Sequence, residues 1–264
     1  MREAIFITGG GSGIGRAVAQ RFAREGWFIG LADIDESGLA ETAALLPQGA
    51  SWTTKLDVQN RAAWDQALAA FVQASGGRLD VLFNNAGVAH GGPFEGNSQA
   101  EIDQLIDVNF RGVAYGAQAA FPYLRDTRSS VLLNTASAAA LYGGAGLAVY
   151  SATKFAVRAL TEALDVEWAG DGIAVRSLMP GFIDTPLLHT PAHAGSNQSK
   201  RDTVVEAGLE FTPVEVVAET AWEAIRSPKL HHLVGKTARR LAFAARWMPG
   251  RLRKTMVRSF GVGK

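Results

Sequence analysis

A short apolar run, Ala4–Thr8, leads into the glycine-rich stretch Gly9-Gly10-Gly11-Ser12-Gly13-Ile14-Gly15, and a segment of helical periodicity follows. This strand–turn–helix unit constrains the fold, because it is typical of a parallel α/β sheet that binds a phosphate-bearing ligand at the turn. Glycines let the backbone approach a pyrophosphate, while the helix N-terminus offers N–H donors and a positive dipole. The spacing departs from G-x-G-x-x-G, and the alternative is a turn that binds nothing. We predict cofactor contacts for Gly9, Ser12, Gly13, Ile14 and Gly15.

The rest of the chain alternates short aliphatic runs with longer segments of helical periodicity, as in a parallel sheet covered by helices on both faces. Strands are predicted at residues 4–8, 28–33, 51–56, 81–84, 130–136, 173–179 and 232–234, and helices at 15–25, 37–46, 61–73, 102–125, 149–169 and 213–226. A chain of 264 residues, 47% of them hydrophobic, can bury one large core. We therefore predict a three-layer, doubly wound Rossmann fold, with one dinucleotide-binding domain over residues 1–235.

Two segments stand apart from this alternation. Residues 184–211 show little apolar periodicity and contain Pro186, Pro191 and Gly195. Because a long irregular stretch inside a compact domain is usually functional, we predict a mobile lid there. Residues 236–264 are predicted to form a basic, amphipathic helical extension.

Asp33 ends the second predicted strand, twenty residues after Gly13. At this position a carboxylate can accept hydrogen bonds from the adenosine ribose hydroxyls, and it would repel a 2′-phosphate. Ile34 follows, where an arginine would have indicated phosphate recognition. Arg2 and Arg16 are the remaining phosphate partners to consider. The pattern favours NAD over NADP.

Tyr150 and Lys154 stand four residues apart in a predicted helix, so they share one face. A nearby ammonium favours the ionised phenol and lowers the tyrosine pKa from about 10 toward the working pH, as proton transfer requires. Ser137, thirteen residues before Tyr150, can hold a substrate oxygen. Singly, these residues are explained by packing, capping or solvation. Together, downstream of a cofactor turn, they favour a catalytic set.

Five blocks, in order, resemble the short-chain dehydrogenase/reductase family from residue 4 to about residue 235. They are Thr8–Gly15, Leu56-Asp57-Val58, Asn84-Asn85-Ala86-Gly87, Asn109, and the set of Ser137, Tyr150 and Lys154 followed by Pro180-Gly181-Phe182-Ile183-Asp184-Thr185. The glycine spacing fits the family's T-G-x-x-x-G-x-G form. The resemblance implies a catalytic tetrad of Asn109, Ser137, Tyr150 and Lys154. It also implies that Asn109 interrupts its helix and holds a water linking Lys154 to solvent.

The same resemblance implies further contacts with the cofactor. These contacts are assigned to Asp57, Val58, Asn85, Ala86, Gly87, Tyr150, Lys154, Pro180, Gly181, Ile183 and Thr185. Asp57 and Val58 would border the adenine, while the Ile183 backbone and the Thr185 hydroxyl would hold the nicotinamide carboxamide. The simpler alternatives are a helix cap at Asp57, strand bracing by the Asn84-Asn85 pair, and an ST-turn at Thr185.

The expected activity is NAD-dependent interconversion of a secondary alcohol and a ketone. Substrate contacts are assigned to Ser137, His90, Ala139, Gly143 and Phe182, although His90 is as readily explained as an exposed loop histidine. The small and apolar residues near Ser137 favour a bulky hydrophobic substrate. The alternatives are an NADP-dependent ketoreductase and a non-catalytic protein that senses NAD(H). No metal site is predicted.

Charge is distributed unevenly along the chain. Residues 229–264 hold ten Lys and Arg and no Asp or Glu, whereas the preceding residues hold sixteen basic and twenty-five acidic residues. Basic and aromatic residues together could rest on anionic lipid. The favoured alternative is a pair of helices packed on the body or across a subunit interface, with their charge neutralised by the acidic core.

Other partners and the location follow from what the sequence lacks. No nucleic-acid partner is expected, because no recognised motif accompanies the basic residues. A homodimer or homotetramer is expected from the family resemblance. There are no cysteines, and the first strand begins too early to leave room for a signal peptide, which predicts a cytoplasmic protein.

Overall fold

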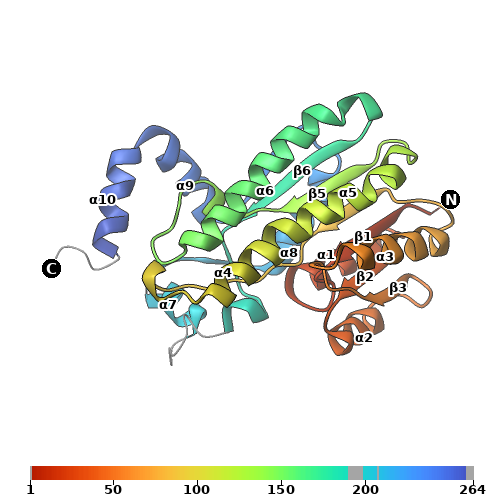
Figure 1. Ribbon diagram of the computed structural model, residues 1–264, viewed down its shortest axis with the longest axis horizontal. Helices are drawn as coiled ribbons and strands as arrows, with labels where there is room; N and C mark the ends of the chain where they lie inside the picture. The colour runs from red at the N-terminus through yellow and green to blue at the C-terminus, as the bar shows by residue number, and fades with distance from the viewer. Residues whose placement is uncertain (1, 190–198, 207, 260–264) are drawn as a thin grey trace.

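The computed structural model describes residues 2–189, 199–206 and 208–259. Its centre is a seven-stranded, all-parallel sheet in the order β3-β2-β1-β4-β5-β6-β9 (Figure 1). The strands are β1 (Ala4–Thr8), β2 (Phe28–Asp33), β3 (Ser51–Lys55), β4 (Val81–Asn84), β5 (Val131–Thr135), β6 (Ala174–Pro180) and β9 (His231–Val234). Helices cover both faces, which confirms the predicted doubly wound α/β fold.

The helices connect and flank these strands. They are α1 (Gly13–Arg24), α2 (Glu36–Ala44), α3 (Arg61–Ala74), α4 (Gln99–Ile106), α5 (Gly112–Arg125), α6 (Ala148–Glu167), α7 (Lys200–Glu206), α8 (Val214–Ala224), α9 (Gly235–Trp247) and α10 (Pro249–Ser259). Apolar side chains of α1, α2 and α8 form the core on one face of the sheet, and those of α3 and α5 form the core on the other.

The strand β1 shows why the first run of the chain is continuously apolar. Ile5 and Ile7 belong to the core under α1, whereas Ala4 and Phe6 belong to the core under α3. Because successive side chains of a strand point to opposite faces, a strand buried on both sides needs apolar residues at every position. From β1 the strands are added toward β3 on one side, and from β4 they are added on the other side. The topological switch point of the sheet therefore lies between β1 and β4.

The helix predicted over residues 102–125 is interrupted. It consists of α4, a π-helical turn (Asp107–Arg111) and α5. The Asn109 side chain accepts a hydrogen bond from Val88 N (2.8 Å) and donates one to Val88 O (2.8 Å). The wider turn therefore lies where an asparagine side chain holds a neighbouring loop, a frequent use of π-bulges at functional sites.

The predicted irregular segment over residues 184–211 contains short elements. They are a 3₁₀ turn (Pro186–His189), the helix α7, and the strand β8 (Phe211–Thr212), which pairs in parallel with β7 (Phe182–Ile183). Pieces this short carry no detectable periodicity, so the sequence indicated only an irregular segment. That this segment is a mobile lid stays a prediction. The remainder of the predicted lid, residues 190–198 and 207, lies outside the described residues.

The C-terminal extension is helical, as predicted. The helix α9 packs inward through the fully buried Ala238 and contacts β9 and the 3₁₀ turn Ala138–Ala140, while α10 packs on α9 (Figure 1). Among the described residues, no helix is both long enough and apolar enough to span a bilayer.

Candidate active site

The glycine-rich turn joins β1 to α1 at the centre of the sheet. Gly13 has φ +49°, and a side chain on Gly15 would overlap the Gly9 carbonyl oxygen. The helix therefore begins in direct contact with the end of the strand, which only glycine permits here. The N-cap residue Ser12 is exposed and makes no side-chain capping bond. The N–H groups in the first turn of α1 thus lie at the carboxyl ends of the strands, where they can bind a ligand.

A cleft of about 310 Å³ opens beside this turn. It is lined by Gly9, Ser12, Gly13, Ile14, Asp33, Ile34, Leu56, Asp57, Val58, Gln59, Asn85, Ala86, Gly87, Val88, Gln104, Val108, Thr185 and Pro186. Most of these residues follow the carboxyl ends of parallel strands, next to the point where the winding reverses. Open α/β sheets bind their ligands at this place.

Asp33 is fixed at the end of β2. Its Oδ2 accepts a hydrogen bond from Gly11 N (3.0 Å) and its Oδ1 accepts one from Asp35 N (3.1 Å). The two backbone donors hold the carboxylate at the edge of the cleft, and each oxygen keeps a further acceptor site. Ile34 beside it is 65% exposed.

The two arginines considered as phosphate partners are engaged elsewhere. Arg16 binds Gly11 O (2.6 Å) and forms an ion pair with Glu41 (2.8 Å). Arg2 donates to the carbonyl oxygens of Gly26 and Gly49. Neither arginine lines the cleft.

The cleft fits a nicotinamide dinucleotide. A bare turn and a helix N-terminus can accept a pyrophosphate, and a carboxylate at the end of β2 can accept bonds from a ribose. On the opposite wall, Thr185 lies over the turn, since a side chain on Gly13 would meet Thr185 Cβ at 3.3 Å. Residues of the glycine turn and of the segment at Thr185 therefore line the same cleft.

Most of the predicted cofactor residues line this cleft, but six do not. The exceptions are Gly15, Tyr150, Lys154, Pro180, Gly181 and Ile183. Gly15 lies behind the turn, and Pro180 and Gly181 face β9 and α9, where Gly181 N donates to Val234 O (3.2 Å). Six further lining residues were not predicted: Leu56, Gln59, Val88, Gln104, Val108 and Pro186. All six except Gln104 directly adjoin a predicted residue, a signal that could have found them.

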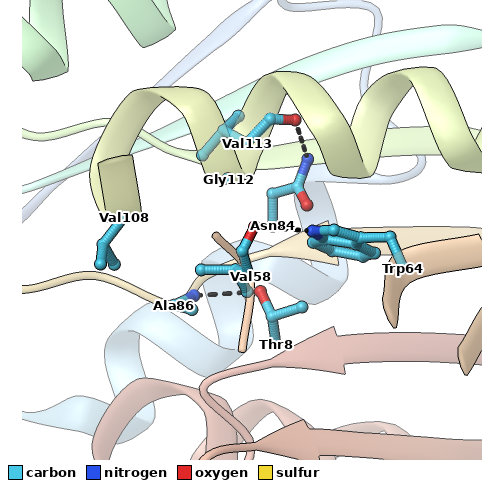
Figure 2. A pocket seen from close by; sticks show the side chains of 8 residues that line it. All are labelled: Thr8, Val58, Trp64, Asn84, Ala86, Val108, Gly112 and Val113. Atoms are coloured by element: carbon cyan, nitrogen blue, oxygen red, sulfur yellow. Dashed lines mark hydrogen bonds between the residues drawn. The ribbon is translucent and has the colours of Figure 1, made fainter. Parts of the chain in front are cut away.

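A closely packed cluster supports the cleft from behind (Figure 2). Thr8 Oγ1 accepts hydrogen bonds from Asn85 N (3.0 Å) and Ala86 N (3.1 Å), which ties the loop after β4 to β1. Asn84 Nδ2 donates to Val113 O (3.2 Å) and to Asn134 Oδ1 (3.1 Å). Asn84 therefore braces β4 against α5 and β5, the simpler of the two roles considered for it.

The four predicted catalytic residues come from three places in the fold. Ser137 follows β5, Tyr150 and Lys154 lie on α6, and Asn109 lies in the π-helical turn. A Cβ placed on Gly87 would lie 3.1 Å from Asn109 Oδ1 and 3.7 Å from Lys154 Nζ. Because Gly87 lines the cleft, Asn109 Oδ1 and Lys154 Nζ both lie beside this part of its wall.

Ser137 and Tyr150 interact directly. The Ser137 Oγ accepts a hydrogen bond from Ala139 N (3.1 Å), so the serine also caps the 3₁₀ turn that follows it. Burial raises the pKa of Tyr150 above its usual value, and the hydrogen bond with Ser137 opposes this shift. The pKa of the phenol therefore depends on the serine hydroxyl in this arrangement.

Lys154 has a different environment from the one predicted. Its Nζ donates to Thr135 O (2.9 Å) and lies 5.8 Å from the centre of the Tyr150 ring. Among the described residues no hydrogen bond is found between the ammonium and the phenol, and the two influences on the Tyr150 pKa are burial and the Ser137 hydrogen bond. Burial lowers the pKa of Lys154 itself to about 8.

This pKa makes the stability of the ligand-free protein depend on pH. The unfolded lysine titrates near 10.5, so between about pH 8 and 10.5 the unfolded chain binds more protons and stability rises with pH. At pH 7 the buried charge costs roughly 3 kcal/mol. We expect Lys154→Met to stabilise the fold by roughly 2 kcal/mol at pH 7, after the loss of the bond to Thr135. Urea unfolding at pH 7 and pH 10 measures this; an equal difference at both pH values would contradict it.

None of the predicted substrate residues, Ser137 included, lines the cleft. His90 Nε2 pairs with Gln104 Oε1 (2.7 Å), and its Nδ1 lies 3.8 Å from Glu101. Phe182 is half-buried in β7, and Gly143 has open space around it. Ala139 touches the site only through its backbone bond to Ser137.

Comparisons with known proteins agree with this geometry. The sequence profile of the family described as "short chain dehydrogenase" matches residues 3–194. A 2,5-dichloro-2,5-cyclohexadiene-1,4-diol dehydrogenase from Sphingobium indicum is 37% identical over 187 residues, which cover 70% of this chain and 74% of that protein. The levodione reductase of Leifsonia aquatica is 37% identical over 191 residues, which cover 70% and 71% of the two chains.

Solved structures give the same result over nearly the whole chain. A short-chain dehydrogenase/reductase from Burkholderia phymatum, crystallised with NAD, superposes with a TM-score of 0.82 at 30% identity, covering 96% of this chain and 95% of that one. The protein therefore belongs to the short-chain dehydrogenase family, oxidoreductases that act on CH–OH groups with a nucleotide cofactor. This confirms the resemblance seen in the sequence.

Proposed function

We propose that this protein uses NAD(H) to interconvert a secondary alcohol and a ketone on a bulky, hydrophobic substrate. The observation that carries the proposal is the meeting of two features at one cleft. Asp33 stands at its edge with both oxygens fixed, and Asn109 and Lys154 lie beside Gly87 in its wall, with Tyr150 on the same helix as Lys154. The first feature favours an unphosphorylated ribose, and the second is suited to proton transfer beside a nicotinamide.

The proposed roles follow from the contacts of each side chain. NAD(H), when bound, supplies the site that accepts or donates the hydride. As the phenolate, the Tyr150 oxygen would take the hydroxyl proton while the carbinol carbon loses its hydride. As the phenol, it would return the proton in the reverse direction. Ser137 Oγ, held by Ala139 N, keeps the substrate oxygen beside the phenol. Lys154 and Asn109 would hold the part of the cleft at Gly87 in place.

The proposed substrate class rests on the residues around Ser137. The following turn consists of Ala138, Ala139 and Ala140, and Leu141 comes next. Such a wall offers apolar contact and no charged group for a phosphorylated or acidic substrate. Relatives named for cyclic diol and dione substrates agree with an alicyclic alcohol or ketone.

The preference for NAD is tested by Asp33→Ala. We expect the variant to bind NAD about tenfold more weakly, because one charge-assisted hydrogen bond to the ribose is lost. It should bind NADP more tightly, because the carboxylate no longer repels a 2′-phosphate. Fluorescence titration with NADH and NADPH measures both dissociation constants.

Asp35→Ala provides the matched control, since Asp35 is a carboxylate near Asp33 that does not line the cleft. It should leave the preference unchanged. If Asp33→Ala also left the ratio of the two dissociation constants unchanged, the proposed basis of NAD preference would be wrong.

A further inference from the structure

The C-terminal helices carry a large unbalanced positive charge. We call residues Gly235–Ser259, which form α9 and α10, the C-terminal hairpin. Its exposed basic residues are Lys236, Arg239, Arg240, Arg246, Arg251, Arg253, Lys254 and Arg258. Within the part of the chain that the structure describes, only Lys236 forms an ion pair, with Glu210 (3.3 Å). Among the described residues, the acidic body therefore pairs none of the other seven basic side chains, and packing of these helices across a subunit interface stays a prediction.

Large apolar side chains lie among these basic residues. Phe243 is 59% exposed and Trp247 is 65% exposed on α9, and Met248 and Val257, which follow them in the hairpin, are also exposed. Phe243 and Trp247 are four residues apart on α9, so they share one face. Arg239, Arg240 and Arg246 lie three or four residues from Phe243 and border the same face. The Arg246 guanidinium stands 5.3 Å from the Trp247 ring centre.

The exposed face is turned away from the body of the protein. The opposite side of α9 packs inward at Ala238, which is fully buried, and at the half-buried Leu241. The helix α10 lies beyond α9 at one end of the molecule (Figure 1). Leu252 and Met256 are its two half-buried apolar residues, whereas its basic residues and Val257 are exposed. The hairpin thus exposes aromatic and basic side chains together on the outer surface of the protein.

We propose that the C-terminal hairpin binds the surface of a bilayer that contains anionic phospholipid. Phe243, Trp247 and Val257 would enter the headgroup region, where aromatic rings are favoured, and the surrounding arginines would contact lipid phosphates. An acidic face of a second copy could also pair the arginines. However, it would leave Phe243, Trp247 and Val257 against charged groups, whereas a bilayer satisfies both kinds of side chain.

Membrane binding through the hairpin would determine where the active site lies relative to the lipid. The helix α9 contacts the turn Ala138–Ala140, which begins immediately after Ser137. A protein seated through the hairpin would therefore hold the Ser137 side of its site near the lipid surface, where hydrophobic alcohols and ketones collect. This consequence rests on the proposed function, whereas the binding itself does not.

The binding is measured by flotation of the ligand-free protein with two kinds of vesicle. One kind contains phosphatidylcholine alone, and the other contains equal parts of phosphatidylcholine and phosphatidylglycerol. We expect binding to the anionic vesicles at low salt and its loss at high salt, because exposed charges are screened. The variant Arg251→Gln/Arg253→Gln/Lys254→Gln should bind about two orders of magnitude more weakly, at about fivefold per basic residue.

Two further variants separate the hairpin from general charge attraction. Phe243→Ala/Trp247→Ala keeps the charge and should weaken binding about tenfold. Arg24→Gln/Arg128→Gln/Lys229→Gln removes the same charge from exposed sites elsewhere and should bind like the natural protein. Absence of binding to anionic vesicles, or equal loss in the hairpin and control charge variants, would overturn the proposal. So would a change of oligomeric state in the hairpin variants without any vesicle binding, which would assign the face to a second copy.

Discussion

Tyr150→Phe should lower turnover by roughly 10²- to 10⁴-fold in both directions, the range expected for loss of a positioned proton donor and acceptor. The substitution removes one hydroxyl from a residue that is half-buried and hydrogen-bonded to Ser137. The ring remains, so the packing of α6 and the cofactor cleft should not change. The dissociation constant for NADH, measured by fluorescence, should stay within about twofold of the natural value. Steady-state rates with a secondary alcohol and its ketone measure the loss.

Tyr123→Phe is the matched control for this experiment. Tyr123 lies in the last turn of α5, packs against the core and does not line the cleft. Its variant should keep the natural rates. Substantial activity in Tyr150→Phe, comparable with that of Tyr123→Phe, would exclude Tyr150 as the group that moves the proton.

Gly15→Ala should disturb both the fold and the binding of the cofactor. The added methyl group would overlap the Gly9 carbonyl and approach Asn85 Nδ2 at 3.1 Å. Since the first obstacle is backbone, it can be relieved only by moving α1 away from β1. We expect a loss of about 1–3 kcal/mol in the free energy of unfolding, the usual cost of overpacking. Because the same movement displaces the donors of the turn, NADH affinity should fall by roughly 100-fold.

Gly170→Ala controls for the loss of a glycine as such. Gly170 lies in an exposed 3₁₀ turn, and no atom lies near the position of its added methyl group. Urea unfolding and NADH titration of both variants give the comparison. If Gly15→Ala matched Gly170→Ala in both measurements, the close contact between α1 and β1 would have no part in cofactor binding.

Much of the fold could be predicted from local sequence. A strand buried on both faces, such as β1, needs an uninterrupted apolar run, and the helices between strands show a clear periodicity. The predicted strands therefore coincide with observed strands to within one or two residues at each end. The turn at Gly9–Gly15 and the carboxylate of Asp33 were placed at the cleft because their positions depend only on neighbouring elements.

Other features depend on contacts between distant segments and left no local signal. Gln104 on α4 and Val108 in the π-helical turn line the cleft, and the neighbouring Asn109 side chain bonds Val88 in the loop after β4. The interaction of Lys154 with Thr135 O joins α6 to β5, and its spacing from Tyr150 alone suggested a direct contact instead. The exposure of Phe243 and Trp247 could not be predicted, because basic and aromatic residues in a helix are equally compatible with packing on the body.

We propose that the protein transfers a hydride between NAD(H) and a secondary alcohol or its ketone at this cleft. The most direct measurement follows nicotinamide absorbance with NAD and with NADP across aliphatic, alicyclic, aromatic and steroid secondary alcohols, and with the corresponding ketones in reverse. We expect bulky apolar alcohols to reduce NAD in preference to NADP. Tight binding of NADH together with no turnover of any alcohol or ketone in the panel would contradict it and would favour a protein that senses NAD(H).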